Sequence, residues 1–170
     1  MSHVKVPIAD RVRARMSLES GAPLRLLWHY QRTALAVLSP GVRTDIARHI
    51  HGHWFNAIPF FNCGDEAERA RLLVALLDGL LPCTFTPFDT IAGRDLRASS
   101  LLFITKGIAV QKGRLLCHGD HIGDGALTSR ARHLVEVRAV TSVQCWSLHR
   151  DTLWDILDSG DFPVSDKRLE

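Results

Sequence analysis

The sequence predicts an α+β protein in which a helical module precedes a small β-barrel or jelly roll and a short helix closes the fold. Three observations support this order. Apolar residues recur at helical spacing before residue 82, the chain after Pro82 divides into short strand-like segments, and helical spacing returns at residues 149–159. The 170 residues allow one good-sized domain or a modest domain with a helical appendage, and a hydrophobic content of 46% is enough for a core.

Four helices are expected before Pro82, over residues 8–16, 24–38, 42–55 and 65–81. The first carries Ile8, Val12 and Met16 at helical spacing, and Gly21-Ala22-Pro23 is expected to separate it from the second. The third is expected to have one apolar face, formed by Val42, Ile46, Ile50 and Trp54. Asp65 can cap the fourth helix, which has a leucine-rich face.

Six strands are expected after Pro82, over residues 83–86, 101–105, 108–111, 114–117, 135–140 and 143–147. Lys112-Gly113 predicts a tight hairpin turn between the third and the fourth of these strands. Short strands at such regular spacing are typical of a small barrel or jelly roll. The pattern then predicts a closing helix with Leu153, Trp154, Ile156 and Leu157 on its apolar side.

The net charge of +3 is mild and does not require a nucleic acid or an acidic membrane as partner. The first helices are nevertheless basic, and their arginines are interpreted as a solvated face, or alternatively as contacts to a neighbouring subunit or an acidic membrane surface: Arg11, Arg13, Arg15, Arg25 and Arg32. The four cysteines form no Cys-x-x-Cys pair, which favours reduced thiols and a cytosolic setting. No apolar run approaches a membrane span and no signal peptide is recognisable, so we expect a soluble chain.

Residues 119–139 combine glycine-rich turns with a basic tract. Glycine lets backbone N–H groups approach an anion, and a short helix that follows offers further N–H donors. Glycine-rich turns between strands are common, so the pattern is weak alone, but it makes this stretch the candidate ligand site.

Six stretches occur in an order and at a spacing that match a known protein family. Residues 38–50 match the pattern L-P-x-x-L-R-x-D-I-x-x-H-L, and residues 58–61 match the start of the domain that follows it. Residues 85–91, 101–107, 119–124 and 137–141 match the patterns P-G-D-x-I, M-Y-F-I-x-x-G, G-D-x-F-G-E and V-R-A-x-T. Together they resemble the C-linker and cyclic-nucleotide-binding domain of tetrameric cation channels of the hyperpolarisation-activated, cyclic-nucleotide-gated, plant inward-rectifier and ether-à-go-go types.

The resemblance implies a helical C-linker-like module at residues 1–62 and a β-jelly-roll domain of cyclic-nucleotide-binding type at residues 63–170. It implies a regulatory and assembly region on the cytoplasmic side of a membrane. The implied partners are the neighbouring subunits of a homo-tetramer, contacted through residues 1–62, and the transmembrane domain of the channel; no nucleic acid is expected. In the family a further helix closes over the nucleotide base, and with only residues 161–170 left here we expect this lid helix to be truncated.

The resemblance also assigns a cassette for cAMP or cGMP to nine residues: Leu116, Ile122, Gly123, Asp124, Gly125, Ala126, Arg132, His133 and Leu134. Ligand-binding members of the family have a Glu for the ribose hydroxyl where this chain has Asp124, and an Arg for the cyclic phosphate where it has His133. Arg132 takes the place of that Arg only if the register shifts by one residue. These departures predict weak or absent nucleotide binding, and they resemble the ether-à-go-go branch.

Other chemistry finds little support in the sequence. His49 and His53 share a helix face at a spacing that can bind Zn²⁺, but a third ligand is missing from the sequence, so we expect no metal and no cofactor. No Ser-His-Asp order, carboxylate pair or P-loop pattern indicates an enzyme. Cys117 is expected in the core, and His118 and His121 in an exposed turn.

Two alternatives to a channel module with a degraded cassette remain open. One is a working cyclic-nucleotide sensor that uses Asp124, the backbone amides of residues 123–126 and either Arg132 or His133. The other is a soluble, non-channel regulatory protein of the same fold. The helical module argues against the second, because kinase-type regulatory subunits of this fold lack a channel-like linker.

Overall fold

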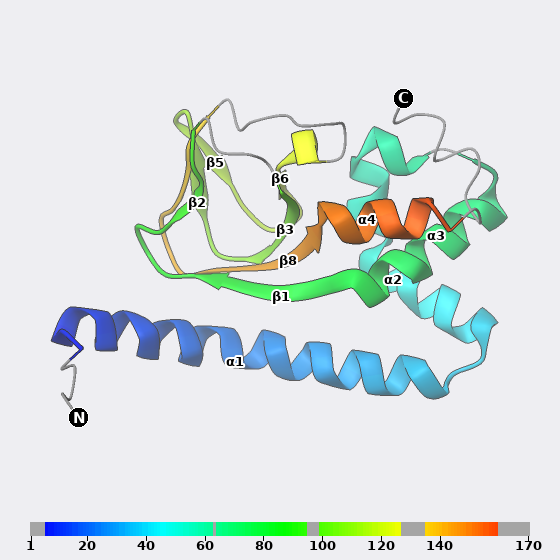
Figure 1. Ribbon diagram of the computed structural model, residues 1–170, viewed down its shortest axis with the longest axis horizontal. Coiled ribbons are helices and arrows are strands. Elements are labelled where there is room, and N and C mark those ends of the chain that lie inside the picture. The colour runs from blue at the N-terminus through cyan, green and yellow to red at the C-terminus, as the bar shows by residue number, and fades with distance from the viewer. Residues whose placement is uncertain (1–5, 63, 95–98, 127–134, 160–170) are drawn as a thin grey trace.

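The computed structural model describes residues 6–62, 64–94, 99–126 and 135–159. Four α-helices, two 3₁₀ helices and eight strands follow one another within these residues (Figure 1). The helical part consists of α1 (Ile8–Val37), α2 (Pro40–Ala57), η1 (Pro59–Asn62) and α3 (Glu66–Gly79). The strands are β1 (Leu80–Phe85), β2 (Thr90–Ala92), β3 (Ser100–Lys106), β4 (Ala109–Gln111), β5 (Arg114–Leu116), β6 (His121–Ile122), β7 (Val137–Ala139) and β8 (Val143–His149), with η2 (Asp124–Ala126) after β6 and α4 (Arg150–Leu157) after β8.

The eight strands form a jelly roll, so the predicted α+β class is confirmed. They lie in two antiparallel sheets with the orders β1-β8-β3-β6 and β2-β7-β4-β5. Strand 1 therefore pairs with 8, 2 with 7, 3 with 6 and 4 with 5, which is the pairing of one long hairpin rolled into two sheets. The predicted turn at Lys112-Gly113 joins β4 to β5, with φ of 48° and 79° at its two central residues.

Two hydrophobic cores meet at the sheet β1-β8-β3-β6. One core fills the barrel and contains Ile104, Ala109, Val137, Val143 and Cys145, all fully buried. The other lies between the outer face of this sheet and the helices, where Trp54 of α2 stacks on Phe103 of β3 with 5.2 Å between ring centroids. The second core includes residues from both sides of the predicted boundary after residue 62, so the helices and the barrel share packed surface.

Helix α1 is continuous through Pro23, and the prediction of two separate helices is wrong. Proline in a helix interior removes one backbone hydrogen bond and costs about 3 kcal/mol. Contacts on both sides of Pro23 offset this penalty. Gly21 is buried close to β1, where a Cβ would lie 2.7 Å from the hydroxyl of Thr84, and the Trp28 indole donates to the Leu80 carbonyl at 2.9 Å.

Helix α2 has the predicted position but a different buried face. Of the expected apolar face, Val42 is 46% exposed and Ile50 is 39% exposed. Trp54 of the expected face is buried, and the rest of the buried side consists of Ala47, His51, Gly52 and Phe55. The helix is rotated from the expected orientation because the aromatic residues near its C-terminal end pack against the sheet and η1.

The remaining helices largely follow the prediction. The Asp65 carboxylate accepts a hydrogen bond from the Glu68 N–H at 2.7 Å, so the expected cap of α3 is confirmed. Helix α3 ends at Gly79 rather than residue 81, because Leu80 and Leu81 pair with β8 as the start of β1. Of the expected apolar side of α4, Leu153 and Leu157 are buried, and Trp154 and Ile156 are half-buried.

Candidate functional site

The central residues of the predicted cassette lie at the end of β6 and in the turn that follows it. β6 is an edge strand that pairs with β3, placing Ile122 opposite Leu102. Gly123, with φ of 98°, turns the chain into η2, the short yellow helix of Figure 1. The chain therefore makes a tight turn and a single helical turn at the position where the sequence predicts a phosphate-holding loop.

The structure brings some of the nine predicted cassette residues together. Gly123, Asp124, Gly125 and Ala126 are consecutive in this turn, with Asp124 exposed. Leu116 and Ile122 lie in the core of the barrel, each 3% exposed, so they support the loop through packing. The last three, Arg132, His133 and Leu134, lie outside the described residues, and the assignment of a phosphate ligand among them stays a prediction.

The turn before β6 is fixed to β3 by backbone and side-chain hydrogen bonds. The Gly119 N–H donates to the Ile104 carbonyl at 3.0 Å, and the Ile104 N–H donates to the Asp120 carbonyl at 2.9 Å. The Asp120 carboxylate accepts from the Cys117 N–H at 2.8 Å. Cys117 is exposed, so its expected place in the core is wrong; β5 ends one residue earlier, and Cys117 belongs to the turn.

Asp124 contacts a histidine side chain within the loop. Its Oδ1 lies 2.9 Å from Nε2 of His121, which belongs to β6 and is half-buried rather than part of an exposed turn. The hydrogen bond to Asp124 raises the pKa of His121, and burial opposes this increase. His118, the other histidine of this region, is exposed as expected, with its Nδ1 2.9 Å from the Thr105 carbonyl oxygen.

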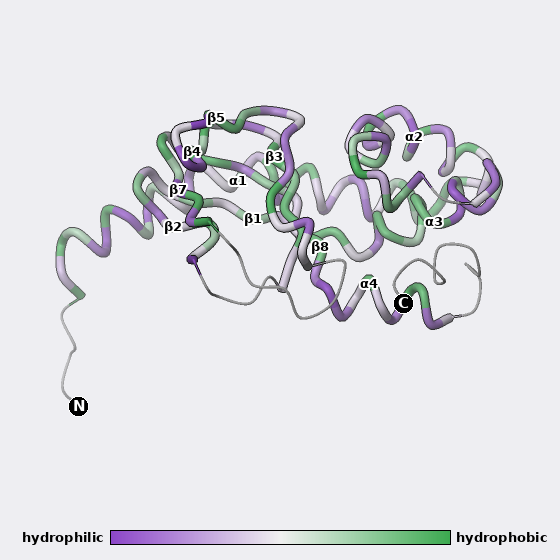
Figure 2. The backbone as a smooth tube through the Cα atoms, turned by 90° about the horizontal axis from the view of Figure 1, so that it is seen from above, coloured by the Kyte–Doolittle hydropathy of each residue, from purple (hydrophilic) through white to green (hydrophobic). Residues whose placement is uncertain are grey.

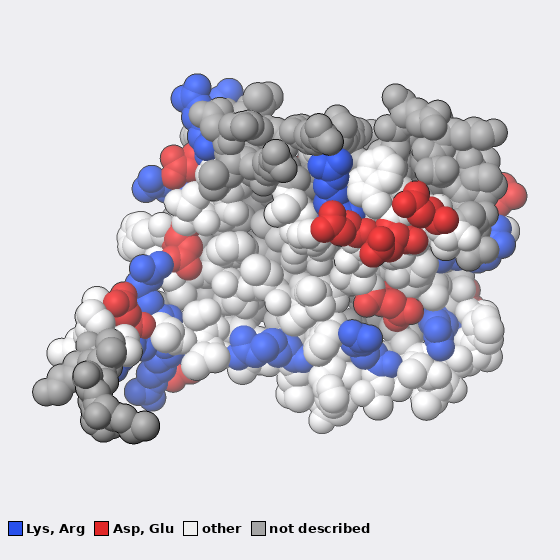
Figure 3. All heavy atoms as spheres, viewed as in Figure 1, with Lys and Arg blue, Asp and Glu red and all other residues white. Residues whose placement is uncertain are grey.

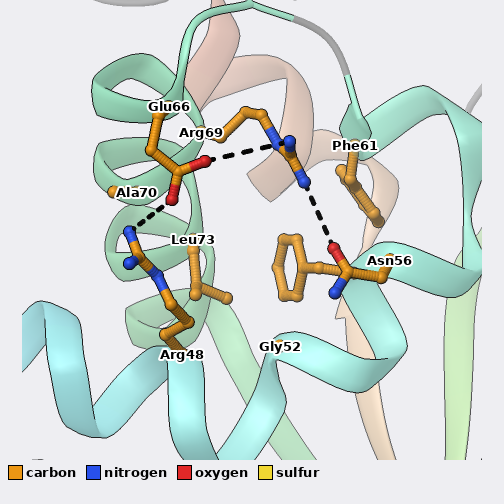
Figure 4. Close-up of a pocket in the computed structure, with 9 residues that line it drawn as sticks. Arg48, Gly52, Asn56, Phe61, Glu66, Arg69, Ala70 and Leu73 are labelled. Atoms are coloured by element: carbon orange, nitrogen blue, oxygen red, sulfur yellow. Dashed lines mark hydrogen bonds and ion pairs between the residues drawn. The ribbon is translucent and has the colours of Figure 1, made fainter.

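A second candidate site lies between α2 and α3, where a cavity of about 220 Å³ opens to the surface (Figure 4). Phe61 of η1 and Leu73 of α3 are among the apolar side chains that line it. Two guanidinium groups share one carboxylate at its rim: Arg48 lies 2.8 Å and Arg69 3.9 Å from the oxygens of Glu66. Arg69 also donates to the Asn56 amide oxygen at 3.2 Å.

This cavity was not predicted from the sequence. Glu66 and Arg69 are spaced three residues apart on α3, which signals only a helix-surface ion pair, and Arg48 reaches them through the packing of α2 against α3. Exposed ion pairs of this kind contribute at most about 1 kcal/mol each. The Arg48–Glu66 pair connects α2 to α3 across the cavity.

The three histidines of α2 occupy different environments. His51 is buried against Trp54 and Trp146, with ring centroids 4.8 Å and 6.2 Å away, whereas His49 and His53 are exposed. Burial, followed by the nearby His53, lowers the pKa of His51 to about 4. Within the described ranges no group of three or more His, Cys, Asp or Glu side chains is placed to hold a metal ion.

Comparison of the sequence with known proteins identifies no relative of this chain. A scan of the chain against models of known protein families finds no match, and a sequence search of curated proteins finds no significant match. In the part of the chain that the structure describes, no helix has both the length and the apolar character needed to cross a lipid bilayer.

Proposed function

We propose that this chain is a cytoplasmic regulatory and assembly region of a tetrameric cation channel of the potassium type. In this proposal its jelly roll is of the cyclic-nucleotide-binding type, with a degraded cassette that binds cyclic nucleotides weakly or not at all. The proposal rests on the sequence resemblance and on one structural observation, the backbone conformation at the glycine positions of the matched motifs.

Each of these glycine positions adopts a positive φ. The values are 96° at Gly107, 92° at Gly119 and 98° at Gly123. In the stretch that matches P-G-D-x-I, the glycine position is occupied by Phe88, whose φ is 70° and whose side chain is exposed. Positive φ is uncommon for residues other than glycine, so the motif pattern and the backbone agree even where the residue type does not. This agreement supports the register of the resemblance.

The cassette lacks the chemistry of a strong cyclic-nucleotide site. Losing one partner of a buried charged hydrogen-bonded pair costs about 2–5 kcal/mol, which corresponds to a fall in affinity of about one and a half to more than three decades. The phosphate position holds His133, and neutral imidazole carries no charge for the phosphate. At the ribose position, the Asp124 carboxylate is already paired with His121, which reduces its availability to a hydroxyl group.

The helical part provides surface for assembly. Val42 and Ile50 on α2 are apolar and substantially exposed in the single chain. In the proposed tetramer, residues 1–62 contact the neighbouring subunit and these side chains are covered there. Because the helices and the sheet share one core, the position of the barrel would then be fixed relative to the helices that form the tetramer contacts.

Isothermal titration calorimetry with cAMP and cGMP tests the cassette, using the wild-type chain and the variant Asp124→Glu/His133→Arg. We expect no measurable binding by the wild type and binding by the restored variant. Micromolar wild-type binding would contradict a degraded cassette and support the working sensor. Failure of the restored variant to bind, with its fold unchanged by circular dichroism, would contradict the register. Light scattering across a concentration series tests assembly, for which we expect a tetramer.

A further inference from the structure

The cavity between α2 and α3 is large enough to hold a small organic molecule. Its volume is about 220 Å³, and an apolar cavity of about 150 Å³ engineered into another protein binds benzene. The cavity opens to the surface, so a ligand can enter while both helices stay in place. Figure 2 shows α2 and α3 next to one another at one end of the fold, each with polar and apolar residues in alternation. The cavity between them accordingly has an apolar wall and a charged rim.

The apolar wall consists of closely packed side chains. Phe55, Phe61 and Leu73 line the cavity and are at most 7% exposed. The ring centroids of Phe55 and Phe61 lie 4.6 Å apart, and the Phe60 ring packs edge-on against Phe61 at 5.3 Å, so the orientation of these rings is fixed. Gly52 of α2 lines the cavity without a side chain. An aromatic ring placed against this wall would gain both apolar burial and ring contacts.

At the rim, two arginines face one carboxylate. Arg48 lies 2.8 Å from one oxygen of Glu66, and Arg69 lies 3.9 Å from the other. Glu66 carries the one carboxylate among the described residues that line the cavity, so the lining has a net charge of 2 − 1 = +1. Arg69 also donates to the amide oxygens of Asn56 and Asn62, at 3.2 Å and 3.0 Å, and Figure 4 shows its side chain extending from α3 to Asn56 of α2. These contacts hold the Arg69 guanidinium at the opening of the cavity.

The preference of this site for an anion comes from the rim and not from the wider surface. On the face that Figure 3 shows, acidic and basic side chains are interspersed over the helical end of the molecule. Two further carboxylates at the start of α3 do not line the cavity: Asp65 caps the helix by accepting the Glu68 N–H, and Glu68 is 5% exposed. The Glu66 side chain, in contrast, is 70% exposed and can turn into water. A ligand carboxylate can therefore take its place between the two guanidinium groups.

We propose that this cavity binds a small aromatic carboxylate, with its ring against Phe61 and Leu73 and its carboxylate between Arg48 and Arg69. The planar guanidinium of arginine matches a carboxylate through parallel N–H donors, and Glu66 shows that a carboxylate fits between these two. Exchanging one exposed carboxylate for another costs little, and burial of the ring supplies the gain in free energy. The proposal concerns α2 and α3 alone and does not depend on the channel function or on the cassette.

An NMR titration of the ¹⁵N-labelled full chain with 3-phenylpropionate tests the proposal. A ligand of about ten non-hydrogen atoms is expected to bind with a dissociation constant of about 1 mM. The largest shift changes should occur at amides of α2 and α3 that line the cavity, and added salt should weaken binding because the rim is partly exposed. The uncharged 3-phenylpropanamide should bind about tenfold more weakly, because it lacks the charge that the arginines pair with.

Three variants separate a ligand site from a structural ion pair. Arg48→Gln should weaken binding about tenfold, through the loss of a charged hydrogen bond. Glu66→Gln should strengthen binding about two- to fivefold, because it removes the carboxylate that competes for the same guanidinium groups. Gly52→Leu should abolish binding by filling the cavity. A Cβ at Gly52 would meet the Arg48 Cγ at 3.6 Å, an ordinary contact, so the helix can accept the larger side chain.

The matched control is Arg71→Gln, since Arg71 is an exposed arginine of α3 that does not line the cavity and its loss should leave binding unchanged. Circular dichroism and thermal unfolding check that each variant keeps its fold. Absence of binding by the wild type at about 10 mM 3-phenylpropionate would overturn the proposal. So would shift changes confined to other parts of the chain, weaker binding by Glu66→Gln, or equal losses in Arg48→Gln and Arg71→Gln. Tighter binding of phenyl phosphate than of 3-phenylpropionate would overturn the assignment to carboxylates.

Discussion

Acidification should destabilise this fold through His51, and replacing His51 with Phe should remove that sensitivity. The imidazole is 4% exposed and packs between Trp54 and Trp146. Burial, with a smaller effect from His53, lowers the pKa of His51 to about 4. Among the described residues none provides a hydrogen bond to its Nδ1, so the buried ring has no partner there for a second proton.

The sign and size of the effect follow from proton linkage. The unfolded chain binds a proton at a pKa of about 6.5, whereas the folded chain binds it only near 4. The stabilising contribution of the neutral ring is therefore complete above about pH 6.5 and declines as the pH falls toward about 4. The expected loss relative to neutral pH is about 2 kcal/mol at about pH 5 and about 3 kcal/mol at about pH 4.

Urea unfolding at a series of pH values measures this loss. The wild type should show it and His51→Phe should not, since Phe keeps an aromatic ring between the two tryptophans and cannot be protonated. Carboxylate titration is common to both chains, so the difference between their stability curves isolates His51. His49→Gln is the matched control on the same helix, and because His49 is exposed it should follow the wild type. Parallel curves for the wild type and His51→Phe between neutral pH and about pH 5 would refute the reasoning.

Two further predictions concern the barrel. Gly107→Ala should destabilise the fold by about 2–4 kcal/mol in urea unfolding, because a Cβ there would clash with the Ser142 carbonyl oxygen in addition to the strain of φ 96°. Gly113→Ala has a similar φ of 79° but open space around it, so it should lose only about 1–2 kcal/mol, and equal losses would show that the clash relaxes freely. Asp124→Asn should lower the pKa of His121 toward its usual value in an NMR titration, because the hydrogen bond to Asp124 raises it. The stability that this pair contributes is complete below about pH 6.5 and lost as the pH rises through the folded-state pKa, so its pH dependence should vanish in the variant; an unchanged His121 pKa would contradict the assignment.

Local features of the sequence were sufficient to predict much of the barrel. Short apolar segments between Gly, Pro and Asp residues located β3 and β8, Lys112-Gly113 located the hairpin, and Asp65 located the start of α3. β2 and β6 were missed, whereas β4 and β5, with three residues each, were located by the turn between them. β2 and β6 instead pair with strands distant in sequence, β7 and β3 respectively, and segments of three and two residues carry no periodicity of their own.

The errors arose where tertiary packing outweighs local preference. Pro23 predicts a helix break, yet the close approach of Gly21 to Thr84 and the Trp28 hydrogen bond hold both halves of α1 along β1. The apolar face expected for α2 was based on spacing alone. The buried side is instead determined by the packing of its aromatic residues against the sheet. Spacing cannot distinguish these faces, because α2 has apolar residues on both.

In the candidate site, too, local features could be predicted and features that depend on tertiary packing could not. The turn at residues 119–126 was predictable because glycine and aspartate types constrain it locally. The cavity between α2 and α3 was not, since Arg48 and Glu66 meet only after the helices pack. The apolar face expected for the first helix is intermediate between these two cases. Ile8, Val12 and Met16 were recognised as an apolar face, and only the structure shows that the chain leaves that face exposed.

The packing between helices and barrel indicates what this fold can do without a bound ligand. Trp54 stacks on Phe103 of β3, and His51 packs against Trp146 of β8, so the outer face of the sheet and the buried side of α2 form one core. Aromatic pairs of this kind contribute about 0.5–1.5 kcal/mol beyond their buried area. Moving the sheet relative to α2 would break both pairs, which makes independent motion of the two parts unfavourable. A barrel held in this way fixes the orientation of the helices without a ligand, and that property is what the proposed assembly role requires.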